Sequence, residues 1–275
     1  ATKFKREVQQ CQSWRTENIN QPQKMLRLKS KMKSMEEEKC KNKALHGQYP
    51  RILEKPQVDT ASPTNGCQVN LKGETKELLV AAKDQAINTR NYQKVICGQQ
   101  VESKYRICSQ YEETVDHIAS GCEVLAKTEY IYRHHNAADD QHEPETVMHN
   151  KDSNILIIWD MPVNTDRTIT ANRSEIVIKD SMNSTSKPID MAVPSDRNIA
   201  LREIEKKSKY KDLELESENA AYETVVIPLL VGALGTEKKG MEENIKKVSE
   251  AATVTEIQKI CILGIVQILR KVLNV

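Results

Sequence analysis

Three residues with metal-binding side chains lie close together in the middle of the chain, in the pattern Cys108-x8-His117-x4-Cys122. Thiolate and imidazole are preferred ligands of structural zinc, and closed structural sites almost always have four ligands in a tetrahedron. A Cys-x2-Cys turn would supply the fourth ligand three residues before Cys108, but Tyr105 occupies that position. The spacing therefore predicts an incomplete zinc site with three protein ligands.

Two substitutes for the missing ligand are Cys97 and His134, and either would require the backbone to fold back on itself. The alternative interpretation is a helical segment in which the cysteines are small buried hydrophobes. A further pair of histidines, His134 and His135, is interpreted as a surface pair.

A second group of residues suits phosphodiester chemistry. Asp190 interrupts an apolar run, and Glu175 opens another run of strand-forming residues, followed later by the basic residues Lys206, Lys207 and Lys209. Two carboxylates at neighbouring strand ends can hold Mg²⁺, and a nearby lysine can orient water or balance phosphate charge. The alternative is a set of strand-end acids on a solvated face beside a helix with a charged outer side.

Other catalytic motifs are not found in the sequence. Gly235-x4-Gly240 is followed by Met241 rather than the lysine and hydroxyl of a phosphate-binding loop, and no Gly-x-Ser-x-Gly elbow occurs.

The elements that would position these residues follow from hydrophobic periodicity. Short β-branched runs predict strands at 154–159, 175–179, 188–193 and 224–231, and helical spacing predicts helices at 75–99, 199–219, 242–250 and 255–272. Three strands, a crossover helix and a further strand imply an α/β domain with a mixed sheet. We therefore expect four regions: a basic helical and linker region at 1–74, a helical segment with the Cys/His cluster at 75–135, a loop at 136–153 and the α/β domain at 154–275.

Composition limits the function classes. The chain has 275 residues, of which 29% are charged, and its mean hydropathy is −0.62. Residues 1–55 carry 14 Lys and Arg against 6 Asp and Glu, a local charge of +8 within a total of +2, so a basic N-terminal arm is expected. Such an arm suits an acidic partner, although many basic arms are simply solvated.

The longest apolar run, 225–234, is too short for a membrane span. Seven unevenly spaced cysteines favour reduced thiols or metal ligands over a disulfide scaffold.

The order of several motifs resembles the C-terminal part of reverse transcriptases from non-LTR retrotransposons that carry a restriction-like endonuclease. The resemblance covers roughly residues 45–275, and the segments that carry it are Leu79–Arg90, Glu113–His117, Thr165–Ile169, Arg173–Ile178, Ile189–Asn198, Lys209–Leu213, Val226–Pro228 and Gly232–Thr236. It implies a zinc knuckle followed by a mixed-sheet, restriction-endonuclease-like domain that nicks DNA to prime reverse transcription.

The family pattern assigns roles to residues of this chain. Cys108, His117 and Cys122 would be zinc ligands, Glu175 and Asp190 magnesium ligands, and Lys206 or Lys209 the catalytic lysine. The sequence departs from the pattern at Tyr105, where the family has cysteine, and at Arg173-Ser174-Glu175, where it has Arg-Pro-Asp. It also lacks the Tyr/Phe-x-Asp-Asp signature of the polymerase. The resemblance thus implies a degenerate fragment of a transposable element, without its polymerase site and with weakened or absent nicking.

Three functions follow from these observations. The first is a nuclease that depends on Mg²⁺ or Mn²⁺, with Zn²⁺ in the knuckle and DNA and RNA as partners. The second is a non-catalytic nucleic-acid-binding remnant that uses the basic arm and the knuckle. The third is an inert decayed reading frame. No secretory signal is visible, so we expect a nuclear or cytoplasmic protein, and no membrane association.

Overall fold

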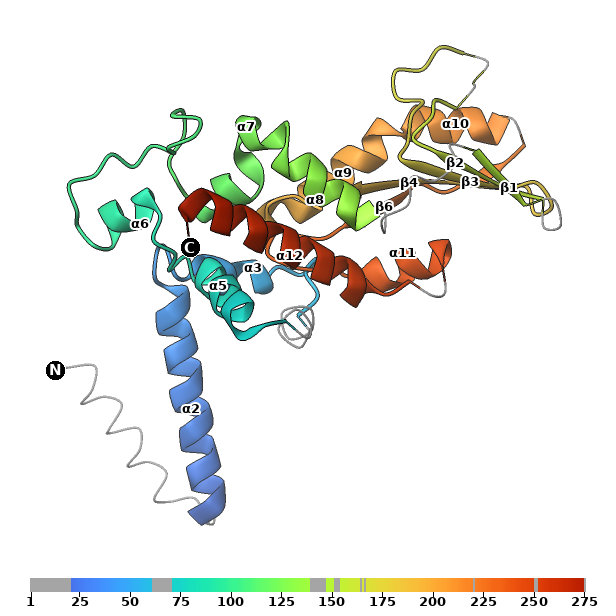
Figure 1. Ribbon diagram of the computed structural model, residues 1–275. Coiled ribbons are helices and arrows are strands. Elements are labelled where there is room, and N and C mark those ends of the chain that lie inside the picture. The colour runs from blue at the N-terminus through green and yellow to red at the C-terminus, as the bar shows by residue number, and fades with distance from the viewer. Residues whose placement is uncertain are drawn as a thin grey trace. The chain divides into compact units, whose positions relative to one another are not determined.

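The computed structural model describes residues 21–60, 71–138, 147–150, 154–163, 165, 167–219, 221–249 and 252–274. The chain divides into two compact units, residues 1–47 and residues 48–275. The strands and the predicted site residues belong to the second unit (Figure 1).

The described part of the first unit contains helix α2, Gln21–Lys41. Its sequence is rich in Lys, Met, Leu and Glu, which are strong helix formers, and Lys39 and Lys41 lie in the last turn, where cations favour the helix dipole. Met25, Leu26 and Met32 remain exposed, so propensity rather than burial accounts for this helix.

Helices make up the first half of the second unit. They are α3 (Gln48–Leu53), α5 (Gly73–Lys83), α6 (Arg90–Val95), the π-helical turn η2 (His117–Gly121), α7 (Glu123–Ala126) and α8 (Glu129–Ala138). The single helix predicted over 75–99 is instead two helices. Gln85 adopts a left-handed backbone conformation (φ 56°) after α5, and the Thr89 side chain then caps α6 by accepting a hydrogen bond from the Tyr92 amide.

The described part of the second half contains the sheet, four α-helices and one short 3-10 helix. The strands are β1 (Val147–Asn150), β2 (Ile155–Trp159), β3 (Ile176–Asp180), β4 (Thr185–Ala192), β5 (Glu223–Thr224) and β6 (Ile227–Leu230). The helical elements are η3 (Asp196–Asn198), α9 (Ile199–Lys209), α10 (Lys211–Asn219), α11 (Met241–Val248) and α12 (Val254–Leu273). Two differences from expectation stand out: β1 lies within the predicted loop 136–153, and the predicted helix 199–219 is divided at Tyr210.

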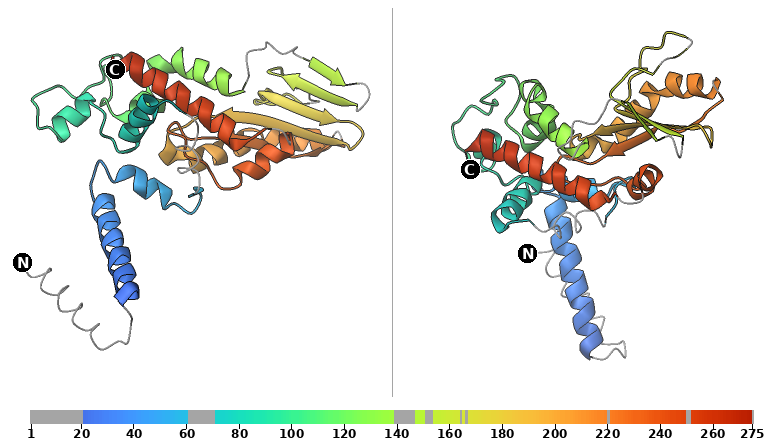
Figure 2. Two further views of the ribbon diagram at one scale, coloured as in Figure 1. Left: turned by 60° about the horizontal axis from the view of Figure 1, so that its bottom comes forward. Right: turned by 45° about the vertical axis from the view of Figure 1, so that its right-hand side comes forward.

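The sheet is mixed, as predicted. Strands β1 to β4 pair antiparallel in sequence order, and β5 and β6 both pair parallel to β4. The parallel pairing requires a crossover, and α9 with α10 provides it between β4 and β5 (Figure 2). The mixed α/β class predicted from the sequence is confirmed.

Alternation along the strands gives the sheet two packed faces. On one face, Met191 of β4 packs in a cluster with Met241 and Ile245 of α11 and Cys261 of α12. On the other face, the buried cluster contains Val177, Tyr210 and Leu213, which come from β3 and the α9–α10 crossover. Asp190 neighbours Met191 in β4 and points to the opposite face from it, because successive strand side chains alternate.

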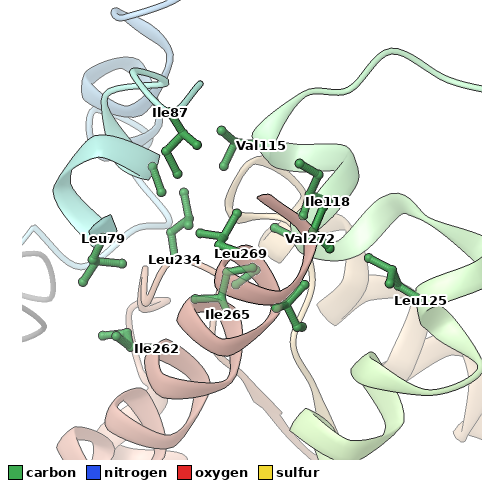
Figure 3. Packing of buried hydrophobic residues seen from close by; sticks show 14 of the residues in the cluster. Leu79, Ile87, Val115, Ile118, Leu125, Leu234, Ile262, Ile265, Leu269 and Val272 are labelled. Carbon is green, nitrogen blue, oxygen red and sulfur yellow. The ribbon is translucent and has the colours of Figure 1, made fainter. Parts of the chain in front are cut away.

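The largest core is built around α12 and includes the helices of the Cys/His segment. Leu79, Ile87, Ile118 and Leu125 come from the first half of the unit and join a row of aliphatic residues on α12 (Figure 3). Helix α12 begins with a capping box, in which the Thr253 hydroxyl accepts from the Glu256 amide and the Glu256 carboxylate accepts from the Thr253 amide. The core therefore spans the predicted boundary between 75–135 and 154–275.

A buried carboxylate ties the start of α9 to the loop after β6. Asp196 accepts hydrogen bonds from the backbone amides of Leu234 and Thr236, at 3.0 and 3.1 Å. Burial raises the pKa of Asp196, while the bonds from Thr236 and Leu234 oppose that rise. Gly232 approaches this carboxylate so closely that an added Cβ would lie 2.3 Å from Asp196 Oδ1. The tie fixes the turn that leads from β4 into α9.

Among the described residues, no helix combines the length and apolar character needed to cross a membrane.

We expect Gly232→Ala to lower the free energy of unfolding by about 1–3 kcal/mol, because the new methyl group must displace a buried, hydrogen-bonded carboxylate. Gly73→Ala is the matched control, since a Cβ there meets no atom within 4 Å and should leave stability unchanged or slightly raised. Urea unfolding followed by circular dichroism measures both. Equal stability of the two variants would contradict the role given to the hydrogen bonds of Asp196.

Candidate functional site

The pairing of β3 with β4 places Glu175 opposite Asp190. The ladder joins Ile176 to Ile189, and extending it by one residue brings Glu175 across from Asp190 on the same face of the sheet. Directly opposed residues of an antiparallel pair have Cβ atoms about 4.5–5.5 Å apart. The two carboxyl groups lie within hydrogen-bonding reach of each other. The sequence predicted this pair of carboxylates, and the structure brings them together.

Of the two candidate lysines, Lys206 reaches the carboxylates. Its Nζ lies 2.7 Å from Asp190 Oδ2 and donates to the Met191 carbonyl at 3.2 Å. Lys209 instead donates to the Tyr210 hydroxyl at 2.7 Å. Both lysines lie on the last turns of α9, but the structure places only Lys206 against Asp190 among the lysines it describes.

Glu175 is held from two further directions. The Met191 amide donates to Glu175 Oε2 at 2.8 Å, and His134 Nε2 lies 3.1 Å from Glu175 Oε1. The same His134 nitrogen lies 3.2 Å from the Met191 carbonyl. The predicted pair with His135 is present, since the two rings meet edge-on at a centroid distance of 6.1 Å, but the His134 side chain is only 28% exposed and also contacts Glu175. The separation of His134 and Glu175 along the sequence does not predict this contact, because the contact depends on how α8 packs against the sheet.

Two other side chains support the pair. Ser174 is buried and donates to the Ile189 carbonyl at 2.6 Å, which ties β3 to β4 at the position where the family pattern has proline. The Tyr210 hydroxyl donates to the Arg173 carbonyl at 3.1 Å. Burial, and then the neighbouring charge of Asp190, raise the pKa of Tyr210, so this hydroxyl remains a hydrogen-bond donor.

The pKa values of the two carboxyl groups are shifted in opposite directions. Burial, together with the hydrogen bond and charge of Glu175, raises the pKa of Asp190 to about 6, although Lys206 acts in the opposite direction. Burial also disfavours the ionised form of Glu175, but hydrogen bonds from His134 and Asp190 hold its pKa below the usual value. The bond to Glu175 raises the pKa of His134. Without a metal ion, the pair favours one ionised and one protonated carboxyl group at mildly acidic pH.

The pair fits a hard divalent cation. Asp190 Oδ2 is buried and, within the described residues, has no aligned hydrogen bond, so its contact with Lys206 is an ion pair that leaves acceptor capacity free. Carboxylate oxygens are the protein ligands that Mg²⁺ prefers, and it keeps several waters when only one or two carboxylates bind it. Glu175 and Asp190 would be the residues that hold it.

The Cys/His segment forms a second cluster. The ligand atoms of Cys108, His117 and Cys122 all lie within 4.8 Å of one another, and Cys108 Sγ lies 3.2 Å from His117 Nε2. Backbone hydrogen bonds outweigh the effect of burial and lower the pKa of Cys108, whereas burial raises that of Cys122. A cluster of three soft or borderline ligands is compatible with zinc.

The backbone around this cluster is braced by buried polar contacts. Glu113 is fully buried and accepts hydrogen bonds from the Arg106 guanidinium and from the Arg90 amide. The Tyr130 hydroxyl donates to the carbonyls of His117 and Ile118 and accepts from the Cys122 amide. These contacts therefore help to position the turn that carries the ligands.

Tyr105 lies at the predicted fourth position. Its ring meets the His117 ring edge-on at a centroid distance of 5.2 Å, and its side chain is fully buried. Its hydroxyl has no hydrogen-bond partner within the described residues, and burial together with the charge of Cys122 raises its pKa. The two predicted substitutes lie elsewhere, because Cys97 is exposed and His134 contacts Glu175. Among the described residues, the cluster therefore has three metal-binding side chains, with the Tyr105 ring packed against one of them, His117.

Comparisons of the sequence with protein-family models and with curated proteins found no match.

In metal-free buffer at pH 8, we expect Asp190→Asn to raise the free energy of unfolding by about 1–3 kcal/mol. A carboxyl group whose pKa is raised in the folded state binds more protons when folded, so its contribution to stability falls as pH rises from about 4 through 6. The increase in the free energy of unfolding caused by Asp190→Asn should therefore be absent at pH 4. Urea titrations at the two pH values measure it, and a gain of the same size at both would contradict the assignment.

We expect Tyr105→Cys to tighten Co²⁺ binding by supplying a fourth thiolate, with Co²⁺ used as a spectroscopic substitute for zinc. Cys108→Ser should weaken binding, whereas Cys97→Ser, an exposed cysteine outside the cluster, should not. Absorbance of the sulfur-to-cobalt charge-transfer band reports the number of thiolates bound. Identical titrations for wild type and Tyr105→Cys would show that position 105 does not face the metal.

Proposed function

We propose that this chain is the knuckle and endonuclease region of a retrotransposon reverse transcriptase, and that it nicks DNA at Glu175, Asp190 and Lys206. The observation that carries the proposal is the meeting of two carboxylates from adjacent strands with a lysine from the helix that follows. The mixed sheet and the order of the motifs support a restriction-endonuclease-like fold.

In this proposal the reaction is hydrolysis of a phosphodiester bond. The oxygen of a water molecule bonds to phosphorus, the P–O3′ bond breaks, and the departing 3′ oxygen takes up a proton. Mg²⁺ or Mn²⁺, when bound, would polarise the phosphate and make water a better nucleophile. Glu175 and Asp190 provide its anionic ligands. Lys206, 2.7 Å from Asp190, places a positive charge beside the phosphate and the attacking water.

Several contacts bear on how active the site is. Glu175 is one methylene longer than the aspartate of the family pattern, yet its carboxyl group reaches Asp190. Its oxygens are already engaged by His134 and the Met191 amide, so a metal ion must share Glu175 with these groups. Weak metal affinity and slow nicking are the expected result.

The remaining parts of the chain fit contact with DNA and RNA. The Cys108, His117 and Cys122 cluster would bind Zn²⁺, and the basic arm would contact phosphates. Such a protein would act in the nucleus or the cytoplasm.

We expect the protein to nick supercoiled plasmid in Mg²⁺ or Mn²⁺ and to lose this activity in EDTA. Asp190→Ala and Lys206→Met should reduce nicking by at least about 100-fold, because each removes a group at the reacting phosphate. Lys209→Met is the matched control on the same helix, and it should retain most activity because Lys209 contacts Tyr210 instead. Gel electrophoresis of nicked and supercoiled forms measures the rate, and nicking that survives Asp190→Ala would refute the proposal.

The second candidate is a nucleic-acid-binding remnant without catalysis. It is favoured by the engagement of Glu175 with His134, which would hold the site closed to metal. Such a protein would bind DNA with an affinity that falls steeply as salt rises, and it would not nick DNA. The Asp190→Ala variant would bind DNA with the same affinity as the wild type.

A further inference from the structure

A polar cavity of about 420 Å³ lies between the Cys/His segment and the start of α9. One wall comes from Thr114 to Gly121, which includes the candidate zinc ligand His117, and the other comes from Pro194 to Arg202. The side chains that matter for ligand chemistry are Ser195, Arg197, Asn198 and Arg202. Hydroxyl, amide and guanidinium groups at these positions suit an oxyanion better than an apolar ligand.

The cavity contains an unused buried donor. Ser195 lines it, is only 9% exposed, and has an Oγ without a hydrogen-bond partner in the part of the chain that the structure describes. A buried hydroxyl left without a partner costs free energy, so a bound ligand that accepts from it would be favoured.

The start of α9 adds a second, independent feature. Asn198 occupies the N-cap position, and its side chain makes no capping hydrogen bond. The 3-10 turn η3 runs directly into α9, and its Asn198 amide already donates to the Ser195 carbonyl, but this end of α9 carries the positive end of the helix dipole, which favours anions. The cavity residues Ser195, Arg197 and Asn198 surround this helix start.

The ion pairs of Arg197 and Arg202 are exposed, so both side chains can rotate to contact a ligand. Arg197 pairs with Asp116 across the cavity while its side chain stays 51% exposed, and Arg202 pairs with Glu205. Exposed ion pairs contribute little to stability, so a phosphate contacted by both arginines can replace them. Asp116 then acts as the partner that holds Arg197 in the absence of ligand.

We propose that this cavity binds a phosphate group of the nucleic-acid backbone, through Arg197, Arg202, Ser195 and the start of α9. This inference rests on the proposed function, because it specifies a backbone contact of the same substrate class. The helix that begins at the cavity carries Lys206 in its last turn, where Lys206 contacts Asp190 of the carboxylate pair. A phosphate held here would position a strand relative to that pair.

The test is binding of a labelled DNA duplex to the full chain, measured by fluorescence anisotropy over a range of salt concentrations. Arg197→Ala/Arg202→Ala should weaken binding, and the plot of log affinity against log salt should become less steep by about one per lost phosphate contact. Arg270→Ala is the matched control, since this paired arginine on α12 lies outside the cavity. Ser195→Ala should weaken binding without changing the salt slope.

The outcomes separate this inference from the proposed function. Equal affinity and slope for the double variant and Arg270→Ala, with both folded by circular dichroism, would overturn the cavity assignment even if Asp190→Ala abolishes nicking. A reduced slope in a protein that never nicks would support the cavity and refute the nuclease. Thermal stabilisation by inorganic phosphate that disappears in the double variant, with DNA binding unchanged, would assign the cavity to free phosphate and overturn the backbone assignment.

Discussion

The antiparallel register of β3 with β4 is the constraint on which the candidate site depends. Side chains alternate along a strand, so a slip of one residue would send either Glu175 or Asp190 to the opposite face of the sheet. The register is secured where it matters most, because the Ser174 hydroxyl bonds the Ile189 carbonyl and the Met191 amide bonds Glu175 itself. Glu175 thus helps to fix the pairing that positions it.

The parallel half of the sheet determines the position of Lys206, the third residue of the candidate site. A parallel neighbour for β4 requires the chain to cross over, and the crossover begins with α9. The turn into α9 is held by Asp196, whose carboxylate bonds the loop that follows β6. The direction of α9, and with it the contact between Lys206 and Asp190, therefore depends on a buried carboxylate outside the site.

Much of the fold was predictable because the relevant signals are local. Strands β2, β3, β4 and β6 are β-branched runs with turns at their ends, and α12 has a continuous apolar face. Strand β1 was missed because its residues are exposed and give no alternation of burial. The long helix predicted before β5 counted Tyr210 among its apolar positions, but the buried Tyr210 ring packs in the core where α9 stops and α10 begins.

The candidate site was predictable in part for the same reason. Glu175, Asp190 and Lys206 lie near one another along the chain, on elements with clear patterns. Only the structure could separate Lys206 from Lys209, since that depends on the rotation of α9. His134 was missed because its contact crosses from α8 to the sheet, and Tyr105 was recognised only as a departure from a cysteine pattern, not as a buried ring against His117.

The position of α12 in the sequence has a consequence for the order in which the molecule can be assembled. Ile262, Ile265 and Leu269 contribute to the core that also encloses Leu79 and Ile118, and Cys261 of the same helix packs with Met191 of the sheet. On the ribosome, the helices of the Cys/His segment and strands β1 to β6 emerge before α12, and exposed apolar surface on an incomplete chain is prone to aggregation. The cluster around Leu79 and Ile118 and the cluster around Met191 both stay incomplete until α12 has been synthesised, so these two parts of the second unit must complete their folding together.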